Sequence, residues 1–309
     1  MKKTQISNLS LHNEDNLKVM ATMPDESIDV ICIDPPYLYL KNQKLERPFD
    51  EQKFFSECKR LLTKNGFIVM FGRGESFYRW NTILADLGFK FKEEIVWNKR
   101  RITSPALALG RLHETISIMT KDSGKLNHCT IPYMENKGFD LDRIENDMKR
   151  IVSTLKNKNL LKHIEEGLKN NEIEDVFYSA KKDKYKIAYR GNTRNKDVGI
   201  ATLNSMLRGC KETSIMSDFG VKYKKIHPTQ KPVRLLERLL ALVIPRDKES
   251  KDIVVADFFA GSMSTMEAVH NMGMRGIATE IEEEYFEAGK KRIEALKEKL
   301  HTYETISNS

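Results

Sequence analysis

Residues 28–37 read IDVICIDPPY and join an apolar run to a rigid turn. The run IDVICI is almost wholly apolar, as in a strand that is covered on both faces of its sheet. Neither strand nor helix continues through the two prolines that follow Asp34. The turn therefore directs Asp34 and the Pro35 carbonyl outward into a cleft. There they can accept two hydrogen bonds from one exocyclic NH2 group, while Tyr37 offers a face on which a planar base can stack.

Strands and helices alternate on both sides of a long middle segment. After the turn, the pattern predicts a helix at 52–63 that ends in a C-cap at Asn65 and Gly66, a strand at 66–72, a helix at 77–87 and strands at 89–97 and 114–119. In the last third it predicts a helix at 232–243, a strand at 252–256, a helix near 262–272, a strand at 275–279 and a helix at 282–299. This alternation indicates an α/β sheet with helices on both faces.

The middle of the chain interrupts this alternation. Residues 140–176 are charged and helical in pattern, and residues 179–225 are basic and rich in loop residues. Residues 179–225 hold 12 Lys+Arg and 4 Asp+Glu, and so carry the whole net charge of +8. We therefore expect one α/β domain, interrupted by an inserted module at 122–225.

The basic stretch favours a nucleic-acid partner over the alternative of a solvated surface. Lysine and arginine neutralise phosphates, and arginine, asparagine and aromatic residues can also contact bases. We expect phosphate contacts from Lys181, Lys182 and Lys184. Base contacts are expected from Arg190 or Arg194 in the turn-rich segment YRGNTRN.

Composition excludes several other classes of protein. A hydrophobic fraction of 40% is too high for a disordered chain, and no segment has the length of apolar residues that a membrane helix needs. The start of the chain has no apolar run of a secretory signal, so we expect a cytoplasmic protein with no membrane partner. The four cysteines form no CxxC pair, and no metal site is expected.

Residues 257–262, DFFAGS, follow the strand expected at 252–256 and open a helix. Small residues in such a turn let backbone N–H groups approach a ligand at the carboxyl edge of a sheet. Glu280 ends the next strand, where an acid can hydrogen-bond both ribose hydroxyls of a nucleoside cofactor. Taken alone, this pattern also suits a tight turn followed by a surface glutamate.

Three motifs together resemble those of the amino DNA methyltransferases that use S-adenosylmethionine. They are Asp34-Pro35-Pro36-Tyr37, the DFFAGS turn and the segment His227-Pro228-Thr229-Gln230-Lys231-Pro232. The third motif resembles the segment that holds the methionine end of the cofactor in the β-group of these enzymes. That group is circularly permuted. The resemblance implies a Rossmann-like methyltransferase sheet, with residues 1–121 as the catalytic half, 122–225 as an inserted target-recognition domain and 226–309 as the cofactor-binding half.

The resemblance also assigns residues. It implies that Asp34, Pro35, Pro36 and Tyr37 are catalytic. The implied cofactor-binding residues are Asp15, Asp34, Thr229, Lys231, Pro232, Asp257, Phe258, Phe259, Ala260, Gly261, Ser262 and Glu280. Asp15 could instead cap a short helix. Met263 stands where the family usually has a second glycine, and we expect it in the first helical turn rather than at positive φ.

The implied activity is methylation of adenine N6 in double-stranded DNA, on a base that is flipped out of the duplex. Residues 38–50 are expected to form a mobile loop over that base. The alternatives are a cytosine-N4 methyltransferase, which more often has Ser in place of Asp34, an RNA N6-methyltransferase and a catalytically silent DNA-binding protein. Further partners that the resemblance allows are a second copy of the chain and a cognate restriction endonuclease. Helix 77–87 could form a dimer interface, but we expect its apolar face to lie in the core.

Overall fold

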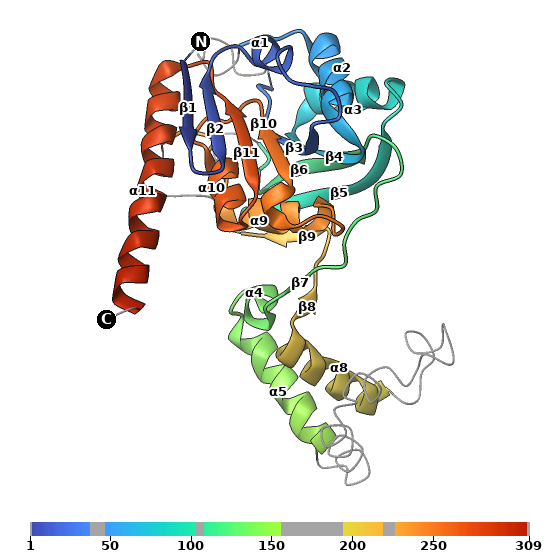
Figure 1. Cartoon of the computed structure of the whole chain (residues 1–309). Helices are drawn as coiled ribbons and strands as arrows, with labels where there is room; N and C mark the ends of the chain where they lie inside the picture. The colour runs from blue at the N-terminus through green and yellow to red at the C-terminus, as the bar shows by residue number, and fades with distance from the viewer. Residues whose placement is uncertain (1, 38–46, 103–107, 156–193, 219–225, 308–309) are drawn as a thin grey trace. The chain divides into compact units, whose positions relative to one another are not determined.

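The computed structural model describes residues 2–37, 47–102, 108–155, 194–218 and 226–307 (Figure 1). The chain forms two compact units, one made of residues 1–127 and 213–309 and the other of residues 128–212. In the part of the chain that the structure describes, no helix combines the length and the apolarity that a membrane span requires.

A mixed sheet forms the centre of the first unit. Its described strands are, in sheet order, β1 (Lys2–Ile6), β2 (Leu9–Asn13), β11 (Arg275–Thr279), β10 (Val254–Asp257), β3 (Ile28–Ile33), β4 (Leu62–Gly72), β6 (His113–Thr120), β5 (Lys90–Asn98) and β9 (Ile215–Ser217). Strands β2, β11, β10, β3 and β4 run parallel to one another, whereas β1 runs antiparallel to β2 and β6 runs antiparallel to both β4 and β5. The α/β sheet that the sequence predicts is therefore confirmed.

Strands β3 and β10 are neighbours in the sheet although they lie far apart in the chain. From β3 the chain passes through α2 (Glu51–Leu61) to β4, and from β10 it passes through α10 (Ser264–Asn271) to β11 on the other side. The chain thus leaves the two strands in opposite directions. The carboxyl ends of two such strands form a topological switch point, where open α/β sheets bind ligands. Asp34 and Asp257 stand at this point.

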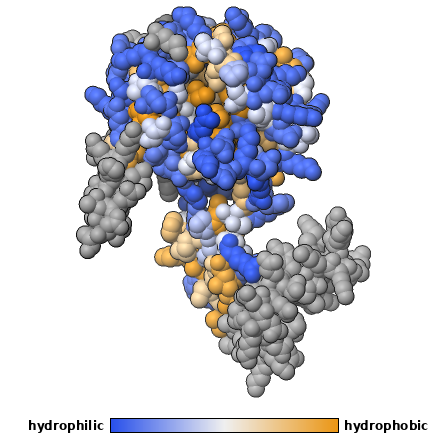
Figure 2. Space-filling model, in the orientation of Figure 1, coloured by the Kyte–Doolittle hydropathy of each residue, from blue (hydrophilic) through white to orange (hydrophobic). Residues whose placement is uncertain are grey.

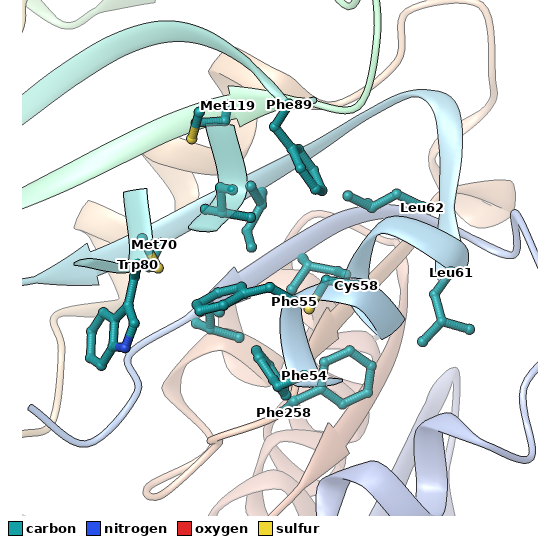
Figure 3. Packing of buried hydrophobic residues seen from close by; sticks show 14 of the residues in the cluster. Phe54, Phe55, Cys58, Leu61, Leu62, Met70, Trp80, Phe89, Met119 and Phe258 are labelled. Atoms are coloured by element: carbon teal, nitrogen blue, oxygen red, sulfur yellow. The ribbon is translucent and has the colours of Figure 1, made fainter. Parts of the chain in front are cut away.

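Helices cover both faces of the sheet. On one face, α2 and α3 (Gly74–Asp86), with α1 (Asn16–Met20) beside α2, enclose an apolar cluster in which Phe54, Phe55 and Trp80 are fully buried (Figure 3). The other face is covered by α9 (Val233–Val243) and α10, and α11 (Glu283–Ser307) contacts α10 and β2. Each buried phenylalanine contributes roughly 1.5–3 kcal/mol to the stability of this scaffold. The apolar face of α3 lies in this core, as expected.

The predicted C-cap at Asn65 and Gly66 is wrong. Helix α2 ends at Leu61, and the chain enters β4 directly at Leu62. Gly66 lies inside this strand, close to a shift in its register with β3. A Cβ atom at Gly66 would come within 3.0 Å of the backbone oxygen of Asp29, so the glycine allows a close approach of two strands instead of ending a helix.

The described residues of the second unit, 128–155 and 194–212, are mainly helical. They form β7 (Thr130–Ile131), α4 (Tyr133–Lys137), α5 (Leu141–Leu155), α8 (Arg194–Arg208) and β8 (Cys210–Lys211), and α5 packs against α8. The sequence predicts a loop-rich segment at residues 194–208, but they are helical, because packing against α5 outweighs the low helix propensity of their glycine and asparagines. Apolar side chains are exposed on this unit, among them Phe139, Leu141 and Met148 (Figure 2).

Candidate active site

A cavity of about 410 Å³ opens at the switch point of the sheet. The predicted residues that line it are Asp15, Asp34, Pro35, Pro36, Tyr37, Thr229, Lys231, Phe258, Phe259, Gly261 and Glu280. A smaller recess of about 50 Å³ shares part of this lining and adds Asp257, Ala260 and Ser262. Among the residues predicted for this site, only Pro232 borders neither space. It is buried at the N-cap of α9, directly after Lys231.

Both carboxylate oxygens of Asp34 have partners. The Tyr37 hydroxyl donates to Oδ1 at 2.6 Å, and the Lys231 ammonium donates to Oδ2. The Tyr37 ring lies 6.1 Å from the Trp80 ring, and the Ser76 hydroxyl donates to the Tyr37 carbonyl at 2.6 Å. An ionised carboxylate has about four acceptor positions, so Asp34 retains positions for further donors. The turn therefore holds a preorganised acceptor at the edge of the cavity.

A second acid, Glu114, extends this interaction into a chain of alternating charges. Its Oε2 atom lies 3.4 Å from the Lys231 ammonium, and its Oε1 atom pairs with Lys99. Burial opposes the charge of Lys231, but Asp34 and Glu114 outweigh it, so the pKa of Lys231 is raised. Burial likewise opposes the charge of Glu114, but the two lysines outweigh it and its pKa is lowered. The chain of charges therefore fixes the Lys231 ammonium against Asp34.

Backbone donors hold the turn after β10, residues 257–262. Glu280 Oε2 accepts from the Gly261 N–H at 2.8 Å, and Oε1 accepts from the Glu282 N–H at 2.9 Å. The Ala260 N–H donates to the Thr279 carbonyl at 3.0 Å. Burial is the main reason why the pKa of Glu280 is raised. The acid thus closes the turn after β10 onto the end of β11.

Asp257, the last residue of β10, contrasts with Asp34. Its side chain is almost fully buried and accepts a hydrogen bond from the Phe259 N–H at 3.0 Å. Burial raises the pKa of Asp257 to about 7, with a further contribution from the charge of Asp34. No described cation neutralises it, so a positive group that enters the recess would lower this pKa and favour the charged form.

The expectation for Met263 is wrong. Met263 precedes the first turn of α10 at a φ of 58°, in the left-handed region where glycine is favoured. Its side chain is completely buried. On α11, a Cβ atom at Gly289 would lie 2.4 Å from Met263 Cγ. The glycine that is missing from the turn is thus replaced by a methionine whose side chain occupies the space left by Gly289.

The cavity also includes Glu114, Phe49 and His227, which were not among the residues predicted for the site, although His227 opens the third sequence motif. Glu114 is the second residue of β6, and in the sequence an acid before an apolar run looks like an ordinary strand-flanking residue. His227 packs its ring 4.4 Å from the Tyr285 ring, and burial lowers its pKa to about 4, so it is neutral near pH 7. The Phe49 ring lies 5.1 Å from the Phe259 ring.

Asp15, which was predicted for the site with helix capping as the alternative, lines the cavity and also caps α1. Its side chain accepts from the Lys18 N–H at 3.2 Å.

The structure gives no side-chain positions for the residues predicted to bind DNA. Lys181, Lys182, Lys184 and Arg190 lie outside the described residues. Arg194 is the first residue of α8, and its side chain is not among those described. Their role stays a prediction.

The fold is that of an α/β methyltransferase. The solved structure of the PvuII cytosine-N4-specific DNA methyltransferase matches it with a TM-score of 0.55 at 15% identity, covering 92% of this chain and 86% of that chain. The M1.HpyAVI–SAM complex matches it with a TM-score of 0.52 at 17% identity, covering 92% of this chain and 99% of that chain.

Two curated relatives are type II methyltransferases. The chain is 25% identical to M.HinfI of Haemophilus influenzae, covering 95% of this chain and 70% of the relative. It is also 25% identical to M2.DpnII of Streptococcus pneumoniae, covering 92% of this chain and 89% of the relative. The model of the N6/N4 DNA methylase family matches residues 28–291. The chain therefore belongs to this family, and it is a DNA methyltransferase that uses S-adenosylmethionine.

Proposed function

We propose that this chain methylates adenine N6 in double-stranded DNA, on a base flipped out of the duplex. The observation that carries the proposal is Asp34, a preorganised carboxylate next to the Pro35 carbonyl at the mouth of the cavity. Together these two groups can accept both N–H bonds of one amine. An aspartate rather than a serine at this position favours adenine over cytosine.

The cavity fits the donor S-adenosylmethionine in size and charge. Its volume of about 410 Å³ lies within the range of small-molecule sites. The donor carries a sulfonium and an ammonium against a single carboxylate. Acidic side chains outnumber Arg47 and Lys231 among the described lining residues, the acids being Glu14, Asp15, Asp34, Asp50, Glu114, Glu280 and Glu282. We infer that Asp257 receives the ammonium in the recess, that Glu280 faces the ribose and that Asp15 lies toward the adenine.

The protein activates the target amine by geometry. When bound, the cofactor supplies an electrophilic methyl group. The lone pair of an aromatic amine is conjugated with the ring, and acceptors on both N–H bonds favour a tetrahedral nitrogen whose lone pair points at the methyl. The amine gains positive charge as it attacks, and the Asp34 carboxylate stabilises that charge. The proton can leave after the new bond has formed, so no strong general base is required.

Lys231 and Tyr37 act on Asp34 instead of on the reacting atoms. They orient the carboxylate from two sides and leave its remaining acceptor positions for the amine. Positioning of this kind supplies a large part of the rate in enzymes that bring two bound reactants together. The Tyr37 ring also lines the cavity, where a flipped base could stack on it.

The organisation of the chain supports the β-group assignment. The tetrapeptide after β3 precedes the turn after β10, and residues 128–212 form a separate compact unit between them. We infer that the fold is circularly permuted and that residues 122–225 recognise the target sequence, with Lys181, Lys182, Lys184, Arg190 and Arg194 at the DNA. A second copy of the chain and a cognate restriction endonuclease are partners consistent with type II relatives.

Cytosine N4 is the second candidate, because the matched family includes both amines. The test is incubation of the purified chain with methyl-labelled S-adenosylmethionine and duplex DNA, followed by analysis of the nucleosides. Label in N6-methyladenine supports the proposal, and label in N4-methylcytosine replaces it with the second candidate. Label in RNA only, or in no nucleic acid, would overturn both. The Asp34→Ala variant serves as the inactive control.

A further inference from the structure

The turn between β5 and β6 combines positive charge with exposed apolar side chains. Residues 98–113 contain four cations, Lys99, Arg100, Arg101 and Arg111, and no acid. Ile102 is 56% exposed and Leu109 is 80% exposed. A turn that faced only water would gain nothing from such apolar side chains, whereas arginines interspersed with apolar groups suit the backbone and grooves of nucleic acid.

This hairpin tip, residues 98–102 and 108–113, stands at the catalytic edge of the sheet. Thr115 of β6 pairs with Gly72 at the end of β4, and Asn98 at the end of β5 pairs with His113. Glu114, the next residue, lines the active-site cavity. The tip therefore projects from the edge at which Asp34 lies.

Ion pairs and hydrogen bonds fix the base of the tip. Lys99 and Lys231 both pair with Glu114, which connects the tip to Asp34. The Lys99 N–H donates to the Leu112 carbonyl at 2.8 Å, and Arg73 Nη1 donates to the His113 carbonyl at 2.8 Å. The position of the tip relative to the reacting centre is thus set by the same residues that orient Asp34.

Local contacts also shape the tip itself. Asn98 Oδ1 accepts from the Arg100 N–H at 2.9 Å, where the backbone turns at a φ of 56°. A Cβ atom at Gly110 would lie 3.1 Å from Ile102 Cδ1, so the two sides of the tip are in contact. Arg100, Arg101 and Arg111 are at least partly exposed on this scaffold.

We propose that the hairpin tip docks on duplex DNA beside the flipped base. Arg100, Arg101 and Arg111 contact phosphates, and Ile102, Leu109 and Leu112 contact sugars and base edges. Charge complementarity identifies the partner, because the tip carries only cations and DNA is a polyanion. This proposal rests on the proposed function, and it assigns a DNA contact that is separate from the basic stretch 179–225.

The test is salt-titrated binding of a fluorescent target duplex by the triple variant Arg100→Ala/Arg101→Ala/Arg111→Ala of the full chain. We expect the dissociation constant to rise by about tenfold or more and the log–log salt slope to flatten by roughly 0.9 for each phosphate that is no longer neutralised. Affinity for S-adenosylmethionine should stay that of the parent. The variant Leu109→Ser/Leu112→Ser should weaken binding without changing the slope.

A matched control removes the same charge from the opposite edge of the sheet. Lys64, Lys90 and Lys92 lie at the start of β4 and β5, away from Asp34, and are at least partly exposed. Their triple alanine variant should bind DNA as the parent does. An equal loss of affinity in both variants, or parent-like binding and slope in the arginine variant, would overturn the proposal. Failure of the parent to methylate any DNA would instead overturn the proposed function.

Discussion

Two aspartates end neighbouring strands at the switch point, and their surroundings are opposite. Asp34 follows β3 and is paired with the Lys231 ammonium and the Tyr37 hydroxyl. Asp257 ends β10, is buried without a described cation, and has its pKa raised to about 7. A carboxylate whose charge is already compensated can act as a ready acceptor for an amine. A carboxyl without a cation is suited to receive one, and we infer that the cofactor brings it.

The largest expected effect follows from removing Asp34, the aspartate whose charge is already compensated. Asp34→Ala should lower turnover by at least about 100-fold, because losing one charge-assisted acceptor costs on the order of 3 kcal/mol of barrier. The fold should persist, since Glu114 still compensates Lys231. Methyl-transfer rates measure the first effect, and calorimetric titration with S-adenosylmethionine should show a loss of affinity much smaller than the loss of turnover. Near-parent turnover would remove Asp34 from the mechanism.

The variant Glu280→Ala tests the inferred contact between Glu280 and the ribose of the cofactor. We expect the dissociation constant for the cofactor to rise by roughly ten- to a hundredfold, since a hydrogen bond to a charged group contributes about 1.5–3 kcal/mol. The same carboxylate also holds the Gly261 and Glu282 N–H groups, so Glu280→Gln is the control that keeps an acceptor in place. Calorimetry on both variants separates the contributions. Unchanged affinity in both would return Glu280 to a purely structural role.

Asp257→Asn should sharpen the difference between the two aspartates through pH. The pKa of Asp257 is about 7 in the folded chain against its usual 3.8, so between these values the folded chain holds a proton that the unfolded chain has lost. Asp257 therefore makes the parent less stable as the pH rises through this window. The asparagine variant lacks this loss, and its unfolding free energy relative to the parent should increase by up to about 4 kcal/mol from pH 4 to pH 8.

Urea unfolding without cofactor at pH 4, 6 and 8 measures this difference. The variant should also bind S-adenosylmethionine more weakly than the parent at pH 8, because it cannot offer a negative charge to the ammonium. A relative stability that does not change with pH would mean that Asp257 is ionised in the folded chain throughout this range.

The smallest effect concerns the backbone of the cofactor turn. Glycine is normally no better than alanine in a helical segment, but at a φ of 58° it should be better. We expect Met263→Gly to be more stable than Met263→Ala by about 1 kcal/mol, although both lose the buried methionine side chain. Thermal unfolding of the two variants measures the difference. Equal stability would show that the turn relaxes to a negative φ.

Sequence patterns located the elements whose signal is local. The apolar run of β3 matches the observed strand Ile28–Ile33 residue for residue, and the tetrapeptide and DFFAGS turns lie at the ends of their strands as expected. The edge strand β1 and its neighbour β2 were missed, because this polar segment forms strands only through the pairing of β1 with β2 and of β2 with β11. The Asn65-Gly66 signal misled for a similar reason, since the partner strand determines the backbone there.

The residues of the candidate site also differ in whether local sequence predicts their role. The motif residues could be predicted because each motif is a short contiguous stretch of sequence. Glu114 could not, because its role depends on two lysines that are distant in the chain and become neighbours only in the folded sheet. The positive φ of Met263 was hidden for the same reason, since the space for its side chain is provided by Gly289 on α11.

The pairing of β3 with β10 also has a consequence for synthesis. Val30 is made early and Val255 late, yet they are partners in the sheet. Until β10 has been synthesised, the edge of β3 that pairs with it is uncovered. Exposed strand edges of this kind promote association between chains. Long-range parallel pairing is also intrinsically slow to form. The cavity at the switch point therefore forms only when nearly the whole polypeptide has emerged, and a product truncated before β10 would keep the tetrapeptide of residues 34–37 without the turn that lines the cavity beside it.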